Sequence, residues 1–174
     1  KSLLEAELIE VLEPSPHRVA PPCDYFGVCG GCSFQHIKYQ EQVSQKLVIL
    51  KRALQKYLPK SVFDELQVIE SSKPFQYRNR IQLEVKNSRF HFRKRRSNEL
   101  VEIDSCLIAE DEVNSYLAKQ KGENTLKDGR HEVGLDQDSL VYDVMKNETR
   151  DGFVFSQVNT ELNHSLKEQV HQIV

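Results

Sequence analysis

The spacing of apolar positions changes along the chain from a helical period to an alternating one. Between residues 36 and 58, apolar side chains such as Val43, Leu47 and Leu54 recur at helical spacing, with lysines and glutamines between them. This spacing places them on one face of a helix, and Pro59 is expected to end it.

Further along, apolar and polar residues alternate, and a period of two predicts strands. Strands are expected at residues 66–70, 81–85, 90–92, 100–103, 131–135, 139–145 and 152–156. Two more helices are expected, at residues 109–120 and 160–173. The three strands between 81 and 103 are separated by short turns, which predicts an antiparallel meander. The fold class is therefore expected to be α+β, with an antiparallel or mixed sheet and flanking helices.

Composition bounds the class of protein. The chain has 174 residues, of which 39% are apolar and 29% charged, as in an ordinary globular domain. No stretch approaches 18 consecutive apolar residues and no secretory signal opens the chain, so no membrane partner is expected. The chain begins with Lys1 and its only methionine is Met145. We therefore expect a fragment or a processed product, and nothing in the sequence predicts its oligomeric state.

Positive charge is concentrated in one window. Residues 73–96 hold nine basic residues and one acid, although the whole chain has a net charge of -2. This segregation is typical of a nucleic-acid-binding face, and a solvated charged face is the alternative. The basic run Arg93, Lys94, Arg95 and Arg96 is either a set of phosphate contacts or a turn between strands that tolerates charge.

Four cysteines form an uneven pattern. Cys23, Cys29 and Cys32 lie in a proline-rich segment, residues 14–35, that is expected to be an extended loop, and Cys106 follows much later. The Gly-Gly pair between Cys29 and Cys32 lets the backbone curl, so that both thiolates can face one centre. Four thiolates suit zinc or a [4Fe–4S] cluster, and a single Cys-x2-Cys knuckle with two lone cysteines favours iron–sulfur. Four buried free thiols are the remaining alternative.

Several segments in order resemble one family. The runs CDYFGVCGGCSFQHIKYQEQVSQK, YRNRIQLEV, FRKRRSNELVEIDSC and FSQVN are similar to the iron–sulfur-containing RNA uracil-5-methyltransferases, which include enzymes that act on 23S ribosomal RNA. The resemblance implies a [4Fe–4S] cluster on Cys23, Cys29, Cys32 and Cys106. It implies RNA contacts by Arg78, Arg80, Arg93, Lys94, Arg95 and Arg96. It also implies that Gln157 contacts S-adenosylmethionine, and that the parent enzyme is cytoplasmic and acts on RNA.

The resemblance also implies a domain division. Residues 1–13 would be the exit of an N-terminal OB-like RNA-binding module, residues 14–150 the cluster and central RNA-binding domain, and residues 151–174 the start of a methyltransferase domain.

The family's reaction requires more than these residues. It needs a cysteine nucleophile that adds to C6 of uracil and a glycine-bearing cofactor site. All four cysteines are assigned to the cluster and no G-x-G motif occurs, so no catalytic residue is assigned and the chain alone is expected to be inactive. The alternatives are a free-standing, non-catalytic RNA-binding module and a zinc-stabilised interaction domain.

Overall fold

A five-stranded sheet organises the protein. The computed structural model describes residues 6, 8–123, 125–136, 138–145 and 157–173. The strands are β1 (Arg80–Lys86), β2 (Arg89–Arg93), β3 (Leu100–Ile103), β4 (Gly129–Leu135) and β5 (Val141–Met145). Their order across the sheet is β3-β2-β1-β4-β5, and every neighbouring pair is antiparallel. The α+β class is confirmed, and the sheet is antiparallel rather than mixed.

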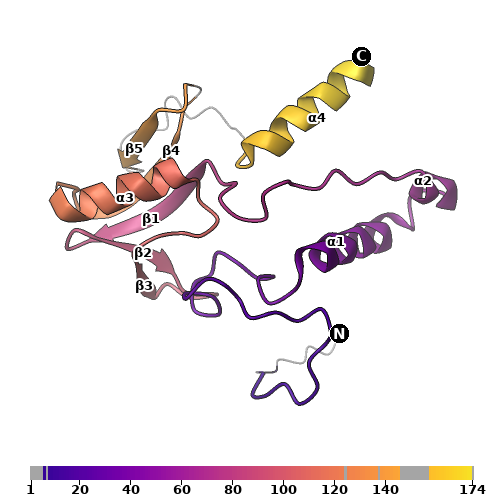
Figure 1. The fold of residues 1–174 in the computed structure, drawn as a ribbon, viewed down its shortest axis with the longest axis horizontal. Coiled ribbons are helices and arrows are strands. Elements are labelled where there is room, and N and C mark those ends of the chain that lie inside the picture. The colour runs from indigo at the N-terminus through magenta and orange to yellow at the C-terminus, as the bar shows by residue number, and fades with distance from the viewer. Residues whose placement is uncertain (1–5, 7, 124, 137, 146–156, 174) are drawn as a thin grey trace.

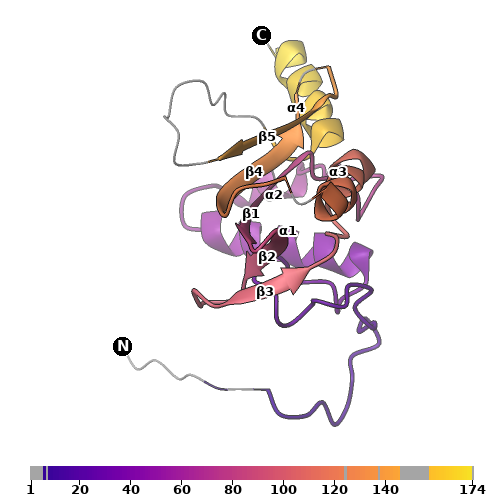
Figure 2. The same ribbon diagram turned by 90° about the vertical axis from the view of Figure 1, so that its left-hand side faces the viewer.

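The core lies between one face of the sheet and helix α3 (Asp111–Glu123), which crosses that face in Figures 1 and 2. Alternate residues of β1 point to this side, and the helix contributes Val113 and Leu117, both fully buried. Phe90 of β2 pairs with Val85 of β1 and with Ile103 of β3, so its ring joins three strands. The alternation in the sequence therefore marked the buried face of the meander correctly.

The other helices lie to one side of the sheet (Figure 1): α1 (Tyr39–Leu54), α2 (Lys60–Asp64) and α4 (Thr160–Ile173). The expected helices near 36–58 and 160–173 are confirmed, but no residue of α1 is buried, and its Val48, Ile49 and Leu50 are exposed. The apolar stripe of this helix therefore does not contribute to the sheet's core.

One expected strand is wrong. Residues 66–70 form neither strand nor helix, and Leu66, Val68 and Ile69 are exposed, because no neighbouring strand offers them a partner. Helix α1 ends at Leu54, before Pro59, so Pro59 does not end that helix as expected and is instead the N-cap of α2. The strand expected at 152–156 lies outside the described residues.

In the described part of the chain, no helix is both long and apolar enough to cross a membrane.

A close approach of three strands makes Gly134 sensitive to substitution. A Cβ at Gly134 would lie 2.7 Å from Arg80 Cβ and 2.8 Å from Tyr142 Oη. We expect Gly134→Ala to lower the free energy of unfolding by about 1–3 kcal/mol, because β1 or β5 must shift to admit the methyl group. Urea unfolding followed by circular dichroism measures the change. An unchanged midpoint would show that these strands separate without cost.

Candidate functional site

The cysteine loop, residues 14–35, is built from turns rather than from helices or strands. Its prolines remove backbone donors, and short backbone hydrogen bonds fold it locally, such as Phe26 N–H to the Cys23 carbonyl (3.0 Å) and Cys29 N–H to the Tyr25 carbonyl (2.9 Å). The expected loop is confirmed, but it is folded locally by turns rather than extended. It presents three thiols within ten residues of each other.

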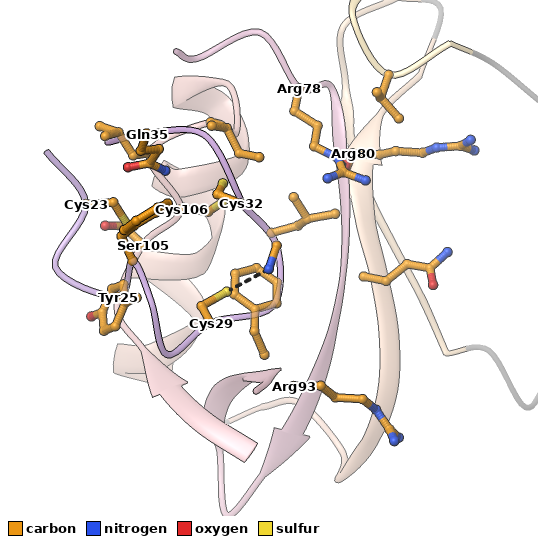
Figure 3. Close-up of a pocket in the computed structure, with 18 of the residues that line it drawn as sticks. Cys23, Tyr25, Cys29, Cys32, Gln35, Arg78, Arg80, Arg93, Ser105 and Cys106 are labelled. Carbon is orange, nitrogen blue, oxygen red and sulfur yellow. Dashed lines mark hydrogen bonds between the residues drawn. The ribbon is translucent and has the colours of Figure 1, made fainter. Parts of the chain in front are cut away.

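All four cysteines line one pocket, with a volume of about 360 Å³ (Figure 3). Cys23, Cys29 and Cys32 come from the cysteine loop, and Cys106 comes from the turn between β3 and α3. Each is a free, partly buried thiol. The fold thus brings together four residues that the sequence separates by up to 83 positions. We call this cavity the cysteine pocket.

Asn114 of α3 fixes the turn that carries Cys106. Its side-chain oxygen accepts a hydrogen bond from Cys106 N–H (2.8 Å), and its side-chain nitrogen donates to the Cys106 carbonyl (3.0 Å). This double contact ties the turn to the first part of the helix. Sequence reasoning missed Asn114, because an asparagine eight positions after a cysteine matches no local motif.

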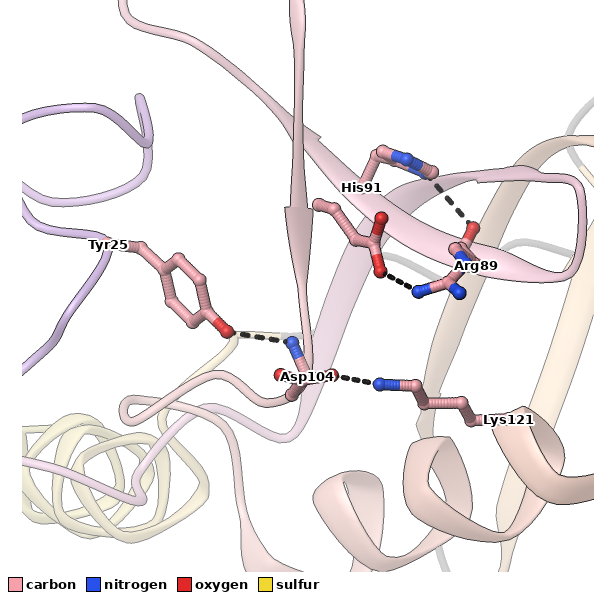
Figure 4. Close-up of polar contacts among 6 residues, drawn as sticks. Tyr25, Arg89, His91, Asp104 and Lys121 are labelled. Atoms are coloured by element: carbon pink, nitrogen blue, oxygen red, sulfur yellow. Dashed lines mark hydrogen bonds and ion pairs between the residues drawn. The ribbon is translucent and has the colours of Figure 1, made fainter.

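Tyr25 ties the cysteine loop to the end of β3, as Figure 4 shows. Its hydroxyl accepts a hydrogen bond from the backbone N–H of Asp104 (3.0 Å), and Asp104 forms an ion pair with Lys121 of α3. Loop, strand and helix therefore meet two residues before Cys106. This junction fixes the position of Cys106 relative to the other three thiols.

Backbone donors face two of the thiols. Burial raises the pKa of Cys29, and the Gly31 N–H, which donates to Cys29 Sγ (3.4 Å), counteracts the shift. Burial also raises the pKa of Cys106, against hydrogen bonds from the backbone of Ile108 and Ala109. The other cysteines raise both pKa values further, because thiolates repel one another. Metal or cluster binding here must therefore displace protons, while the N–H groups are placed to stabilise bound thiolates.

The thiols do not form a site for a single ion. Across the described residues, no three His, Cys, Asp or Glu side chains are arranged to hold one metal ion. Tetrahedral zinc holds its sulfurs about 2.3 Å from the metal, which requires them to converge closely. In a [4Fe–4S] cluster each thiolate binds a different iron, so the sulfurs surround a larger body. In this structure the four thiols share the wall of one pocket without converging on one point.

Arginines form the opposite wall of the cysteine pocket. Arg78, Arg80 and Arg93 all line it, and in Figure 3 the side chains of Arg80 and Arg93 extend away from the cysteines. Arg78 Nε donates a hydrogen bond to the Arg80 carbonyl (3.0 Å). Arg80 Nη1 lies 3.9 Å from Oε1 of the buried Glu132 carboxylate. Arg78, Arg80 and Arg93, for which the family resemblance implied RNA contacts, therefore belong to the wall of this pocket.

The basic turn, residues 93–96, packs directly against the cysteine loop. Gly30 N–H donates to the Arg93 carbonyl (3.0 Å), and Arg95 N–H donates to the Val28 carbonyl (3.2 Å). A Cβ at Gly30 would lie 3.1 Å from that Arg93 oxygen, so the close approach favours glycine. The backbone of the turn is thereby held against the cysteine loop.

Half of the basic turn is neutralised within the protein. Arg93 pairs with Glu84 (2.8 Å) and Lys94 with Glu99 (2.7 Å). Arg95 and Arg96 are exposed and form no ion pair among the described residues. From the sequence, all four residues of the basic turn are equivalent candidates for phosphate contacts. The structure separates them, because only Arg95 and Arg96 present charge that no acidic side chain of the described residues neutralises.

Gln157 does not line the cysteine pocket, although the next residue, Val158, does. Gln157 is exposed, and its backbone carbonyl accepts a hydrogen bond from the Asn79 side chain (3.2 Å) just before α4. Asn159 caps that helix through the Leu162 N–H (2.9 Å). Residues 155 and 156 of the FSQVN segment lie outside the described residues. Cofactor binding by Gln157 stays a prediction.

The aromatic side chains of the meander are mainly structural. Phe90 is 2% exposed, and Phe92 packs partly buried against the same core. Phe90 therefore belongs to the core, and Phe92 packs against that core while also lining the cysteine pocket.

The chain is similar to RNA methyltransferases. No family model matches it. It is 36% identical over 170 residues to an uncharacterised RNA methyltransferase of Bdellovibrio bacteriovorus, covering 95% of this chain and 43% of the relative. An uncharacterised RNA methyltransferase of Aquifex aeolicus is 35% identical over 67% of this chain and 28% of its own length.

One relative has a more specific name. The 23S rRNA (uracil(1939)-C(5))-methyltransferase RlmD of a Marinomonas species is 36% identical over 115 residues, which are 64% of this chain and 25% of the relative. The chain therefore spans less than half the length of the curated relatives it matches. The similarity to RNA methyltransferases extends over nearly all of this chain.

Proposed function

We propose that this chain is the cluster-bearing, RNA-recognising part of an S-adenosylmethionine-dependent RNA uracil-C5 methyltransferase that acts on ribosomal RNA in the cytoplasm. Its similarity to RNA methyltransferases supports the reaction class, and the RlmD relative supports the uracil-C5 position. A [4Fe–4S] cluster on the four cysteines and S-adenosylmethionine near Gln157 are part of this proposal. The proposal also includes the division into domains given above, with boundaries between residues 13 and 14 and between residues 150 and 151.

One observation carries the proposal: all four cysteines line one pocket, and the backbone of the basic turn is hydrogen-bonded to the loop that carries three of them. Cys23, Cys29, Cys32 and Cys106 would hold the cluster, with N–H donors at Cys29 and Cys106 offsetting its negative charge. When bound, the cluster would cross-link the loop to the turn after β3. Methyl transfer requires no net electron transfer, so this role is structural.

The remaining residues of the site would bind and orient RNA. Arg95 and Arg96 would contact phosphates, which positions a strand without reading its bases. No cysteine is left to attack uracil, so the 174 residues alone are proposed to bind RNA without methylating it.

Removing the accessible charge of the basic turn should weaken RNA binding. We expect Arg95→Ala/Arg96→Ala to lower affinity for a ribosomal RNA hairpin roughly tenfold at low salt, because two phosphate contacts and their counterion release are lost. The slope of log Kd against log salt should become shallower by about 1.4–1.8. Fluorescence anisotropy across a salt series measures both quantities.

The matched control is Arg93→Ala/Lys94→Ala, which removes two charges of the same turn that Glu84 and Glu99 already neutralise. We expect its effect on affinity to be several-fold smaller. Equal affinities of wild type and the Arg95/Arg96 variant would contradict the RNA assignment and favour the interaction-domain alternative.

A further inference from the structure

A second pocket adjoins the cysteine loop on another side. Its volume is about 530 Å³, within the range of small-molecule sites, and it lies between the loop, the start of α1 and residues 74–77. Gly31 and Cys32 line both this cavity and the cysteine pocket. We call it the aromatic pocket, because Phe34, Phe75 and Tyr77 lie in its wall.

An unpartnered buried group points to a ligand. Gln35 is 8% exposed and lines both pockets, and its side-chain oxygen accepts no hydrogen bond from any of the described residues. A buried acceptor without a donor costs free energy. Thiolates and the sulfides of a cluster only accept hydrogen bonds, so a loaded cysteine pocket cannot supply the missing donor. A molecule in the aromatic pocket with an N–H group can.

The rim of the aromatic pocket carries positive charge. Lys38 and Lys46 line it, both are exposed, and neither forms an ion pair among the described residues. Aromatic walls, a buried acceptor and two peripheral ammonium groups match a nucleotide: a flat base with N–H donors and a phosphate. The cysteine loop also contacts the basic turn through Gly30, so one RNA strand can follow this loop from charge to pocket.

We propose that the aromatic pocket binds one unpaired base of the RNA, with Gln35 Oε1 accepting a hydrogen bond from the base and Lys38 and Lys46 contacting the adjacent phosphates. Phe34, Phe75 and Tyr77 supply apolar and stacking surface. This inference rests on the proposed function, since it deepens RNA recognition to a base-binding subsite. The basic turn holds the backbone, and the aromatic pocket holds the base.

The test compares two fluorescein-labelled probes of equal length, an oligouridylate and an abasic ribose-phosphate oligomer, on anaerobically purified full chain. Wild type should bind the oligouridylate about tenfold more tightly, because only that probe offers a base to stack and to donate a hydrogen bond. Phe34→Leu and Gln35→Leu should each weaken oligouridylate binding about three- to tenfold and leave abasic affinity unchanged.

Controls separate the pocket from general effects. Tyr57→Leu alters an aromatic residue that is 80% exposed and outside the pocket, so it should not change either affinity. Phe34 is itself 37% exposed, so its variant should fold even if Gln35→Leu does not. Lys46→Ala should weaken binding of both probes, because Lys46 is proposed to contact phosphate. Lys56→Ala should weaken neither, because Lys56 is exposed and does not line the aromatic pocket.

Equal binding of both probes by wild type would overturn the base subsite while RNA binding by the basic turn stands. Wild-type affinity of Phe34→Leu for the oligouridylate would also overturn the base subsite. Failure of wild type to bind either probe would overturn the subsite and the proposed function together.

Discussion

Replacing Cys106 with serine is expected to remove most of the iron and acid-labile sulfide from the protein. Wild type purified without oxygen should hold about four of each per chain under the proposed function. Cys106 is the only proposed ligand from outside the cysteine loop, so Cys106→Ser deletes the link between that loop and the turn after β3. We expect the metal content to fall several-fold.

Loss of this link should also destabilise the protein, because binding free energy at such a site contributes to folding. A loss of about 2 kcal/mol lowers the midpoint of thermal unfolding by about 4–8 °C in a chain of this size. Ser105→Ala is the matched control, since Ser105 lines the same pocket and precedes Cys106. It should retain iron, sulfide and melting temperature.

Two results would contradict the cluster. Unchanged iron in Cys106→Ser would remove this residue from the ligand set. One zinc per wild-type chain without sulfide would favour the zinc-stabilised interaction domain instead.

Replacing Asp143 with alanine is expected to cost about 3–5 kcal/mol of stability. Asp143 Oδ1 lies 2.8 Å from His131 Nδ1, and its Oδ2 accepts a hydrogen bond from the Tyr116 hydroxyl (3.0 Å). The His131 and Asp143 side chains are 3% and 9% exposed. Burial and the Asp143 charge raise the pKa of Tyr116, which keeps the phenol protonated as a donor. Asp143→Ala leaves the buried His131 and the partly buried Tyr116 without this acceptor and removes a contact between β5 and α3.

Urea unfolding measures this effect, and two further variants grade it. Tyr116→Phe removes only one hydrogen bond and should cost about 1 kcal/mol. Asp138→Ala, an exposed acid in the turn before β5, should change stability by less than about 0.5 kcal/mol. A cost below about 1 kcal/mol for Asp143→Ala would show that this contact does not hold the edge strand.

Local sequence determined the meander and the cysteine loop. Ile81, Leu83 and Val85 alternate because one face of β1 is buried, and that information is complete within a few residues. The prolines of residues 14–35 likewise exclude helix and strand without help from the rest of the chain. The expected strand at 66–70 failed for the converse reason, since an apolar run forms a strand only where another strand supplies hydrogen bonds.

Buried polar contacts were beyond prediction from the sequence. No ligand spacing surrounds His131, so nothing in the sequence assigns it a role, yet it is buried against Asp143 from the neighbouring strand. Gln35 follows the cysteines as one polar residue among several, and only the fold places it between two pockets. Such roles depend on which groups meet across elements, and spacing along the chain does not encode that.

The sequence by itself determined the number and types of the candidate ligands, the location of the positive charge and the α+β class, because these depend on residue identity and local periodicity. The tertiary structure decided that Cys106 joins the other three thiols in one pocket and that Asn114 fixes it there. It also decided that Arg95 and Arg96, rather than Arg93 and Lys94, present the accessible charge. Those outcomes rest on distances between residues far apart in the chain, which only the folded backbone sets.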